Sequence, residues 1–243
     1  MLIDLHAHSH LSMGCDLSPR AVLDRAQSHG LAGVAFTETN TQDGCDELLA
    51  LGEKSAVLVF VGLELNTDKG QYLCFFPDPD KVADPVQLWG SNRERPWSAE
   101  ECLPRVKAMG AAIVAARPYD REFSHPMLDH VLALKDTVCA IEGYNARARQ
   151  VANDLALEAA NTLRVRCVGG SDARESVDEV GRGATFFKAP VKTQDDLVTA
   201  LKTAEYWPVM VGDIPRLSRP GEAREADRSR PKKRNRFRPR PAG

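Results

Sequence analysis

The chain has 243 residues, 43% of them hydrophobic and 27% charged, which is enough apolar content for a folded domain with a substantial core. Its net charge of −2 hides an asymmetry: from Pro215 onward eleven Lys and Arg face three acidic residues, so this segment carries +8 and the remainder −10. No apolar run approaches the ~20 residues that a membrane-spanning helix needs. No leader sequence is visible and the six cysteines form no C-x-x-C pair, so we expect a cytoplasmic location with reduced thiols.

Nine short apolar runs have the length and composition of β-strands. They alternate with helical patterns, an order typical of a mainly parallel sheet that is either open or closed into a barrel. The stretch 77–96 holds four prolines and few apolar repeats, so we expect a surface loop there. The expected strands cover residues 2–8, 33–38, 56–67, 72–76, 111–118, 138–145, 166–172, 184–189 and 207–212.

Capping residues and glycines mark the expected helices. Ser18 and Pro19 begin the first helix and Gly30 ends it. The stretch SAEE at 98–101 has the form of a capping box, which predicts that a second helix begins there. Two further helices are expected, one over 146–163 and one from about 193 to 204.

The stretch DLHAHSHLSMG, residues 4–14, places three histidines at alternate positions. His6 and His8 lie two residues apart on the first expected strand, so their side chains share one face and can bind the same ion. An H-x-H pattern alone is weak support for a metal site. His10 shares that face only if the strand continues, and the following LSMG indicates that the strand ends.

Polar residues also gather at the ends of later expected strands. The carboxyl ends of parallel strands form the active sites of (β/α) barrels, so these residues are expected to converge with the histidines. They are Thr37 and Glu38, Glu64, Arg117, Glu142 and Asn145, and Asp172.

Taken together, these motifs resemble those of the PHP (polymerase and histidinol phosphatase) domain, a family of metal-dependent phosphoesterases. The first family motif, D-x-H-x-H-S-x-x-S-D-G, is similar to DLHAHSHLSMG, and T-D-H-N is similar to TETN at 37–40. Glu64 lies in VGLEL, where the family has a glutamate after the third strand, and ARP (116–118), EGYN (142–145) and GSDAR (170–174) stand where it has A-H-P, E-x-x-N and G-S-D-A-H. The resemblance spans residues 1–212. It implies an α/β fold, a distorted TIM-like (β/α)7 barrel over residues 1–213, followed by a tail over 214–243.

The departures from the family pattern fall at its metal ligands. Met13 stands in place of an aspartate, and Thr39, Arg117 and Arg174 stand in place of histidines. The resemblance implies that one peripheral metal site is lost and that a second lacks a ligand. One complete set remains, and it implies a single Zn²⁺, Mn²⁺ or Fe²⁺ ion. The members of this set are His6, His8, Glu64 and Asp172.

Two functions remain open at this point. In the first, the protein is a mononuclear phosphoesterase acting on nucleotides or nucleic-acid ends, in which Arg117 and Arg174 bind phosphate and Glu38 assists. In the second, the two guanidinium groups fold onto Glu64, Glu38 or Asp172, and the domain is a silent binder of a phosphorylated ligand, nucleic acid or a protein. An amidohydrolase ranks last, because no histidine follows at the later strand ends.

The C-terminal segment is expected to be a separate basic tail. From Arg228 to Arg240 (RSRPKKRNRFRPR) it contains eight basic residues, no acidic residue and one aromatic residue. Such a run suits contact with nucleic-acid phosphates, with release of counterions. A solvated, disordered terminus is the alternative interpretation.

Overall fold

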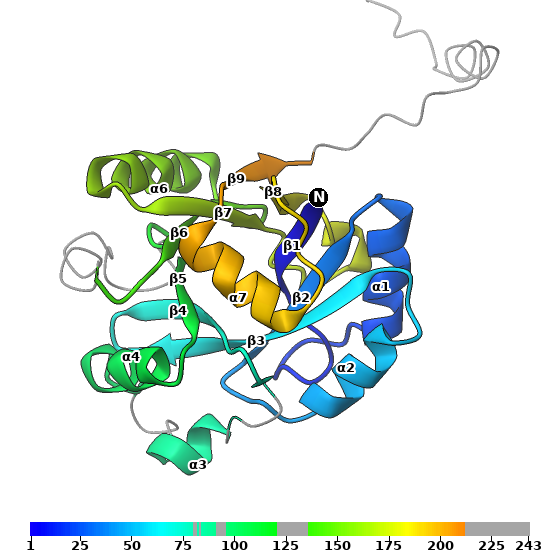
Figure 1. Cartoon of the computed structure of the whole chain (residues 1–243), viewed down its shortest axis with the longest axis horizontal. Coiled ribbons are helices and arrows are strands. Elements are labelled where there is room, and N and C mark those ends of the chain that lie inside the picture. Colours follow the sequence, from blue (N-terminus) through cyan, green and yellow to red (C-terminus); the bar gives the residue numbers. More distant parts are fainter. Residues whose placement is uncertain (80–81, 83, 91–95, 121–135, 212–243) are drawn as a thin grey trace, which may run out of the picture. The chain divides into compact units, whose positions relative to one another are not determined.

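Nine strands form one sheet in the computed structural model, which describes residues 1–79, 82, 84–90, 96–120 and 136–211 (Figure 1). All nine strands expected from the sequence are confirmed, with ends within two residues of those expected. The expected basic tail lies outside the described residues. The strands are β1 (Leu2–Ala7), β2 (Gly33–Thr39), β3 (Leu58–Thr67), β4 (Gly70–Phe75), β5 (Ala112–Ala116), β6 (Ala140–Asn145), β7 (Arg166–Gly170), β8 (Gly183–Phe187) and β9 (Tyr206–Met210).

The sheet is mixed. Its strand order is β7-β6-β5-β4-β3-β2-β1-β8-β9. β1, β2 and β3 pair in parallel, as do β5, β6 and β7, whereas β4 runs antiparallel to both neighbours and β8 runs antiparallel to β1 and β9. The expectation of a mainly parallel sheet is therefore wrong at β4 and β8, which run opposite to the other seven strands. The reason at β4 is local: only Asp68 and Lys69 separate it from β3, and so short a connection permits only an antiparallel hairpin.

The sheet curls into a nearly closed barrel, as the sequence predicts. The Thr185 hydroxyl on β8 donates to the Gly169 carbonyl on β7 and accepts from the Gly169 amide, both at 2.9 Å. Beyond the end of β7, the Asp172 amide donates to the His6 carbonyl at 2.6 Å. Backbones approach so closely here that a Cβ atom on Gly183 would overlap the Gly170 carbonyl oxygen. This seam brings the ends of β1 and β7 together.

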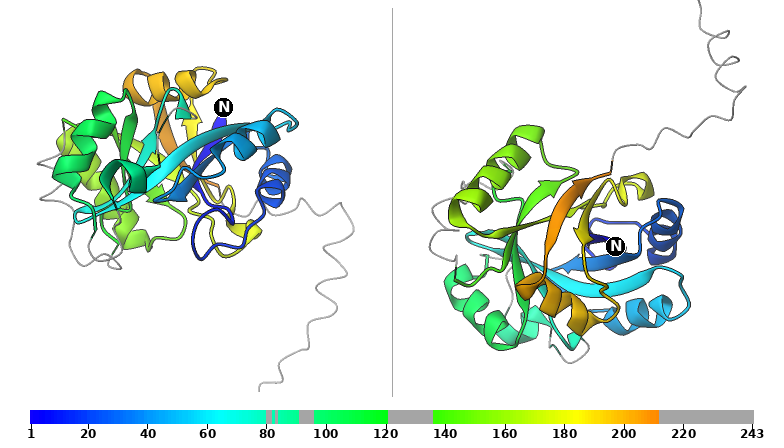
Figure 2. Two further views of the ribbon diagram at one scale, coloured as in Figure 1. Left: turned by 90° about the horizontal axis from the view of Figure 1, so that it is seen from below. Right: turned by 45° about the horizontal axis from the view of Figure 1, so that its top comes forward.

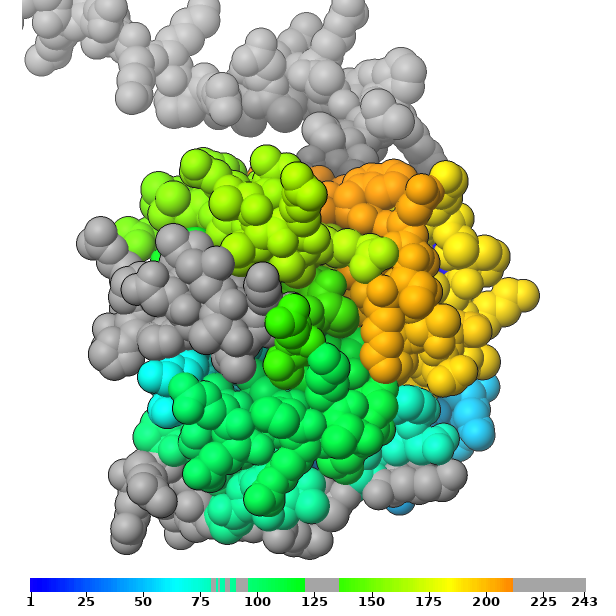
Figure 3. Space-filling view, turned by 60° about the vertical axis from the view of Figure 1, so that its left-hand side comes forward, coloured from blue at the N-terminus to red at the C-terminus, as the bar shows by residue number. Residues whose placement is uncertain are grey.

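Helices surround the strands (Figures 1 and 2). On the side of the molecule seen in Figure 3, residues of α6 (yellow-green), of the green segment that includes α4, and of α7 and β9 (orange) form neighbouring parts of the surface. A short helix, α3, occupies part of the stretch 77–96, which corrects the expectation of a plain loop. None of the described helices is long and apolar enough to cross a membrane. The helices are α1 (Pro19–Ser28), α2 (Cys45–Gly52), α3 (Pro85–Trp89), α4 (Ala99–Ala108), α6 (Gln150–Leu163) and α7 (Gln194–Thr203), with a 3₁₀ turn, η2, at Val177–Glu179.

One helix starts where the sequence predicts but without the expected cap, and another starts later than predicted. Ser98 precedes α4, but its side chain makes no capping hydrogen bond; instead the Ala99 amide donates to Asp68 Oδ1 at 2.9 Å. The helix expected from residue 146 begins at Gln150, because the Asn145 side chain accepts the amide hydrogens of the two residues that would form its first turn. Side-chain oxygens that bond nearby amides compete with helix initiation in this way.

Apolar side chains fill the space between the helices and the sheet. One cluster lies between α4, α6 and strands β3 to β6, and another between α1, α2 and strands β1 to β3. Every residue of β5 is buried, which explains its uninterrupted apolar sequence AIVAA. Against this apolar background, the charged residues buried at the strand ends stand out.

Candidate active site

Two histidines and two carboxylates converge at the ends of three strands. His6 is on β1, His8 follows that strand, Glu64 is on β3 and Asp172 follows β7, and all four are fully buried. His6 Nε2 lies 3.3 Å from Glu64 Oε1 and 3.6 Å from Asp172 Oδ1. His8 Nε2 lies 3.4 Å from the same Asp172 oxygen. The structure thus brings together the four residues that the family resemblance groups as one ligand set.

This cluster has the chemistry of a cation site. His6 Nε2, Glu64 Oε1 and Asp172 Oδ1 are buried and have no hydrogen-bond partner within the described part of the chain. Burying such atoms without a partner is costly, so three of them facing one another point to a shared ligand. Donor atoms of His6, His8 and Glu64 all lie within 4.8 Å of one another. Imidazole and carboxylate together suit Zn²⁺, Mn²⁺ or Fe²⁺, so the residues present fit one such ion.

A carboxylate on β6 orients His6. His6 Nδ1 and Glu142 Oε1 are 2.8 Å apart, so a hydrogen on Nδ1 leaves the Nε2 lone pair directed into the cluster. Asn145 Nδ2 donates to Glu142 Oε2 at 3.1 Å and approaches Asp172 Oδ2 at 3.4 Å. A Cβ atom on Gly170 would overlap His6 Cβ, which explains the need for glycine there.

The Ser12 hydroxyl, itself bonded to Glu38, orients the His8 ring. Ser12 Oγ donates to Glu38 Oε2 at 2.5 Å, which leaves its lone pairs to accept a hydrogen from His8 Nδ1 at 3.1 Å. His8 then presents its Nε2 lone pair to the cluster. Glu38 also accepts from the Ser9 hydroxyl at 2.6 Å. In this geometry Glu38 reaches the cluster through Ser12 and His8 and makes no direct hydrogen bond to the other cluster residues among those described.

Arg117 is locked against the carboxylates. Its Nη1 lies 3.0 Å from Asp172 Oδ2, its Nη2 donates to Gln71 Oε1, and its backbone amide donates to Glu142 Oε2 at 3.1 Å. Only 8% of its side chain is exposed. Burial alone would lower the pKa of Arg117, but Asp172 and Glu64 more than offset this and raise it. Arg117 is therefore a fixed positive charge beside the ligand set.

Arg174 hydrogen-bonds the cluster through one nitrogen, Nη2, and its Nε lies 3.9 Å from Asp172 Oδ1. Its Nη2 lies 2.8 Å from His8 Nε2, 3.0 Å from Thr39 Oγ1 and 3.0 Å from Glu64 Oε2. Its side chain is 22% exposed. Both arginines thus face the carboxylates, which is the inward-folded arrangement of the two considered from the sequence.

The electrostatic field of the site favours a cation. Burial opposes ionisation of Glu64, but the adjacent His6 and His8 lower its pKa to about 2. The pKa of Asp172 is also lowered despite burial, by His6, His8 and Arg117. Burial would lower the pKa of His6, yet Glu142 and Asp172 raise it well above its ordinary value.

Strained backbone marks the same region. Arg117 and Asp172 have φ angles of 42° and 52°, and Asn40, next to Thr39, has a φ of 57°. A left-handed conformation is uncommon outside glycine, and such strain gathers at functional sites. Arg117 and Asn40 directly follow β5 and β2, and Asp172 lies two residues after β7.

Some sequence expectations lie away from the cluster. His10 is exposed, which agrees with a strand that ends before it. Met13 is 94% exposed, so its side chain takes no part in the cluster. Gln71, on the central antiparallel strand β4, had no signal in the sequence, whereas Ser9 and Ser12 lay within the quoted first motif.

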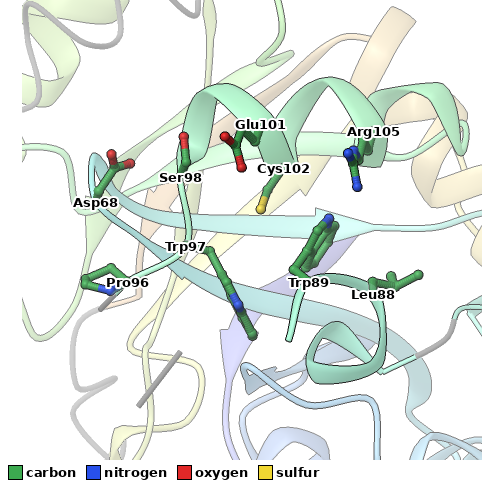
Figure 4. Close-up of a pocket in the computed structure, with 9 residues that line it drawn as sticks. All are labelled: Asp68, Leu88, Trp89, Pro96, Trp97, Ser98, Glu101, Cys102 and Arg105. Atoms are coloured by element: carbon green, nitrogen blue, oxygen red, sulfur yellow. The ribbon is translucent and has the colours of Figure 1, made fainter. Parts of the chain in front are cut away.

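Two hollows of the described part of the chain are lined by other residues. One of about 560 Å³ lies between α3, α4 and the β3–β4 turn, where the rings of Trp89 and Trp97 are 5.7 Å apart (Figure 4). A smaller one, of about 260 Å³, includes Ser171 and Arg147. Neither is lined by His6, His8, Glu64 or Asp172.

Comparisons with known proteins define the class. Residues 4–162 match the PHP domain family, and residues 150–206 match the PHP-associated family. The chain belongs to the PHP domain family. This agrees with the barrel and with the histidine and carboxylate cluster at its strand ends.

Particular relatives share parts of the chain. It is 31% identical over 118 residues to a 3′,5′-nucleoside bisphosphate phosphatase of Chromobacterium violaceum, covering 47% of this chain and 39% of that protein. It is 29% identical over 140 residues to an uncharacterized protein of Methanocaldococcus jannaschii, covering 57% of this chain and 73% of the relative.

Solved structures share the fold. A two-domain protein of Bacteroides vulgatus containing a predicted PHP-like metal-dependent phosphoesterase superposes with a TM-score of 0.66 at 16% identity, covering 86% of this chain and 64% of that one. PsfC of Pseudomonas syringae superposes with a TM-score of 0.65 at 20% identity, covering 88% of this chain and 93% of that one. At these identities the likeness concerns the fold.

Proposed function

We propose that the protein is a metal-dependent phosphoesterase with one divalent ion, Zn²⁺, Mn²⁺ or Fe²⁺, bound by His6, His8, Glu64 and Asp172. The observation that carries this proposal is the set of buried, unpartnered atoms of His6, Glu64 and Asp172 that face one another. A bound divalent ion acts as a Lewis acid that lowers the pKa of water and offsets the charge of a phosphate ester.

The protein's own residues would prepare the site for a phosphate ester. Glu142 holds the His6 ring, and Ser12 with Glu38 holds the His8 ring, so Glu38 acts as a positioning residue. Arg117 neutralises Asp172. Arg174 supplies a planar donor fork that matches phosphate oxygens.

Nucleotides or nucleic-acid ends are the proposed substrates. The partial identity to a 3′,5′-nucleoside bisphosphate phosphatase supports this class. The absence of disulfides among the six cysteines, all of them described, supports the cytoplasm as the location. The basic segment from Arg228 to Arg240 would add contacts to nucleic-acid phosphates.

The direct test is metal content together with phosphatase activity. Protein purified without chelators is expected to hold about one divalent ion per chain and to release phosphate from nucleotides or from 5′- or 3′-phosphorylated oligonucleotides. His8→Ala should lose both the ion and the activity, because it removes one donor of the set. His10→Ala is the matched control: it removes an exposed histidine from the same stretch and should change neither. Two or three ions per chain would contradict the mononuclear site.

A silent binding domain is the second candidate. The observation that favours it is that both arginines already pair with the carboxylates of the ligand set. In that case the wild-type protein would be metal-free and inactive, and would still bind a phosphorylated ligand.

The contribution of the tail is tested by deleting residues 215–243. Binding to a phosphorylated oligonucleotide should weaken, and its dependence on salt should flatten, because fewer phosphates are neutralised. Unchanged binding and an unchanged salt slope would remove nucleic-acid contact from the proposal.

A further inference from the structure

One side-chain nitrogen of Arg174 hydrogen-bonds two atoms that a metal ion would need as ligands. Nη2 of Arg174 is 2.8 Å from His8 Nε2 and 3.0 Å from Glu64 Oε2, two donors of the proposed ligand set. It also approaches Thr39 Oγ1 at 3.0 Å. A guanidinium nitrogen thus lies among three nitrogen and oxygen donors, a setting that resembles cation coordination.

His8 Nε2 has one lone pair, and this lone pair cannot serve two partners. Ser12 fixes the tautomer, because its hydroxyl hydrogen goes to Glu38 and its lone pair accepts the hydrogen of His8 Nδ1. The Nε2 lone pair therefore accepts from Arg174 in this structure. Binding of a metal ion at His8 and withdrawal of the Arg174 side chain must accompany each other.

The Arg174 side chain, unlike that of Arg117, can move away from the cluster. Its backbone amide is anchored to Glu179 Oε2 at 2.9 Å, while the hydrogen bonds of its side chain to described residues all run through Nη2. Its side chain is 22% exposed, compared with 8% for Arg117, which is held by both Asp172 and Gln71. Arg174 can leave the cluster without unsettling the backbone that carries it.

We propose that Arg174 couples metal binding to phosphate binding. In the ligand-free protein its guanidinium group binds His8 Nε2 and Glu64 Oε2. When a metal ion binds these two atoms, the guanidinium group moves away from them and binds phosphate. This inference rests on the proposed function, since it needs the metal site. A guanidinium displaced from Glu64 keeps its full charge and regains its donors, and a phosphate dianion supplies matching acceptors.

Coupling of this kind is reciprocal. If phosphate holds Arg174 away from His8, it strengthens metal binding, and the metal strengthens phosphate binding by the same factor. Phosphate also contacts a metal ion directly, which gives some coupling without the arginine. The specific contribution of Arg174 is therefore the part of the coupling that disappears when Arg174 is replaced.

The test titrates Mn²⁺ into metal-stripped full-length protein by calorimetry, with and without inorganic phosphate. Arg174→Ala should bind Mn²⁺ about tenfold tighter than wild type without phosphate, because a charged hydrogen bond no longer competes for His8. Phosphate should tighten Mn²⁺ binding at least tenfold in wild type and much less in the variant. Arg174→Gln, which keeps an amide but no charge, should behave similarly and guards against a folding defect.

Arg147→Ala is the matched control. The charge of Arg147 interacts with that of Asp172, which helps to raise the pKa of Arg147. Its ion pairs, however, are with Glu175 and Glu179 and not with His8 or Glu64. It should leave the phosphate-induced tightening at the wild-type level. A general effect of removing positive charge would appear equally in this variant and would overturn the specific role of Arg174.

The remaining outcomes separate the two proposals. Equal or weaker Mn²⁺ binding by Arg174→Ala, or equal coupling in variant and wild type, would overturn the coupling and leave the metal site standing. If Arg174→Ala binds Mn²⁺ and wild type does not, even with phosphate present, Arg174 blocks the metal site permanently. That result would also overturn the coupling. Absence of Mn²⁺ binding in every protein would overturn the proposed function and the coupling with it.

Discussion

The two sides of the site hold their arginines in opposite ways. On the Arg117 side, formed by Arg117, Gln71, Glu142 and Asn145, every one of these polar side chains bonds another or Asp172. On the Arg174 side, formed by Arg174, Thr39 and His8, a single guanidinium nitrogen makes the hydrogen bonds to these residues and part of the side chain meets solvent. The comparison shows how one site combines a permanent charge with an exchangeable one. A buried arginine held by Asp172 and Gln71 sets the charge balance, and a partly exposed one can respond to ligands.

Replacing each arginine by methionine should show the largest difference between the two sides. Arg117→Met leaves the carboxylate of Asp172 buried beside Glu64 with one fewer positive partner. Breaking a buried ion pair costs about 3–5 kcal/mol, so we expect a loss of that order in the free energy of unfolding, measured by urea denaturation of metal-stripped protein. Arg174→Met should cost less than Arg117→Met, because the Arg174 side chain is 22% exposed, against 8% for Arg117, and is therefore partly solvated. Equal losses would show that the two sides are not held differently.

The carboxylate that lies between the two arginines should respond to pH. The pKa of Glu64 in the folded protein is about 2 against an ordinary value of 4.5. Its ionised form therefore stabilises the fold above pH 4.5, and this stabilisation is lost as the pH falls from 4.5 toward 2. Such a shift corresponds to about 3 kcal/mol.

Glu64→Gln removes that titration and isolates its effect. We expect the difference in unfolding free energy between wild type and Glu64→Gln, both metal-stripped, to be largest at neutral pH and to shrink as the pH falls below 4.5. Chemical denaturation at a series of pH values measures it. A difference that stays constant with pH would mean that Glu64 is not held ionised by its neighbours.

The sequence was most informative where function and local pattern coincide. The alternation of His6 and His8 and the acidic residues at the strand ends located the cluster, because parallel strands deliver their carboxyl ends to one rim. Gln71 could not be found in this way, since its contact with Arg117 depends on the antiparallel pairing that places Gln71 opposite Ala116. The helix start at Gln150 was missed for a similar reason: the Asn145 side chain competes for amides that the helical pattern would otherwise use.

The smallest expected effect concerns the support of His8. Ser12→Ala removes the hydroxyl that joins His8 Nδ1 to Glu38, and leaves a fully buried carboxylate oxygen with one partner fewer. Loss of such an outer partner typically weakens metal binding about 10- to 100-fold. We expect the lower end for Ser12→Ala, because Ser9 still donates to Glu38 and keeps that carboxylate in place.

Mn²⁺ titration of metal-stripped Ser12→Ala measures this effect, and Ser28→Ala provides the control. Among the described residues, Ser28 donates to the Arg25 carbonyl at the end of α1, so its loss should leave metal affinity unchanged.

A comparison with Glu142→Gln tests the difference between the two sides of the site. Glu142 supports His6 and also accepts from Arg117 and Asn145 on the fully bonded side, so its replacement should weaken Mn²⁺ binding more than Ser12→Ala does. A larger effect of Ser12→Ala would place the rigid support of the metal site on the Arg174 side.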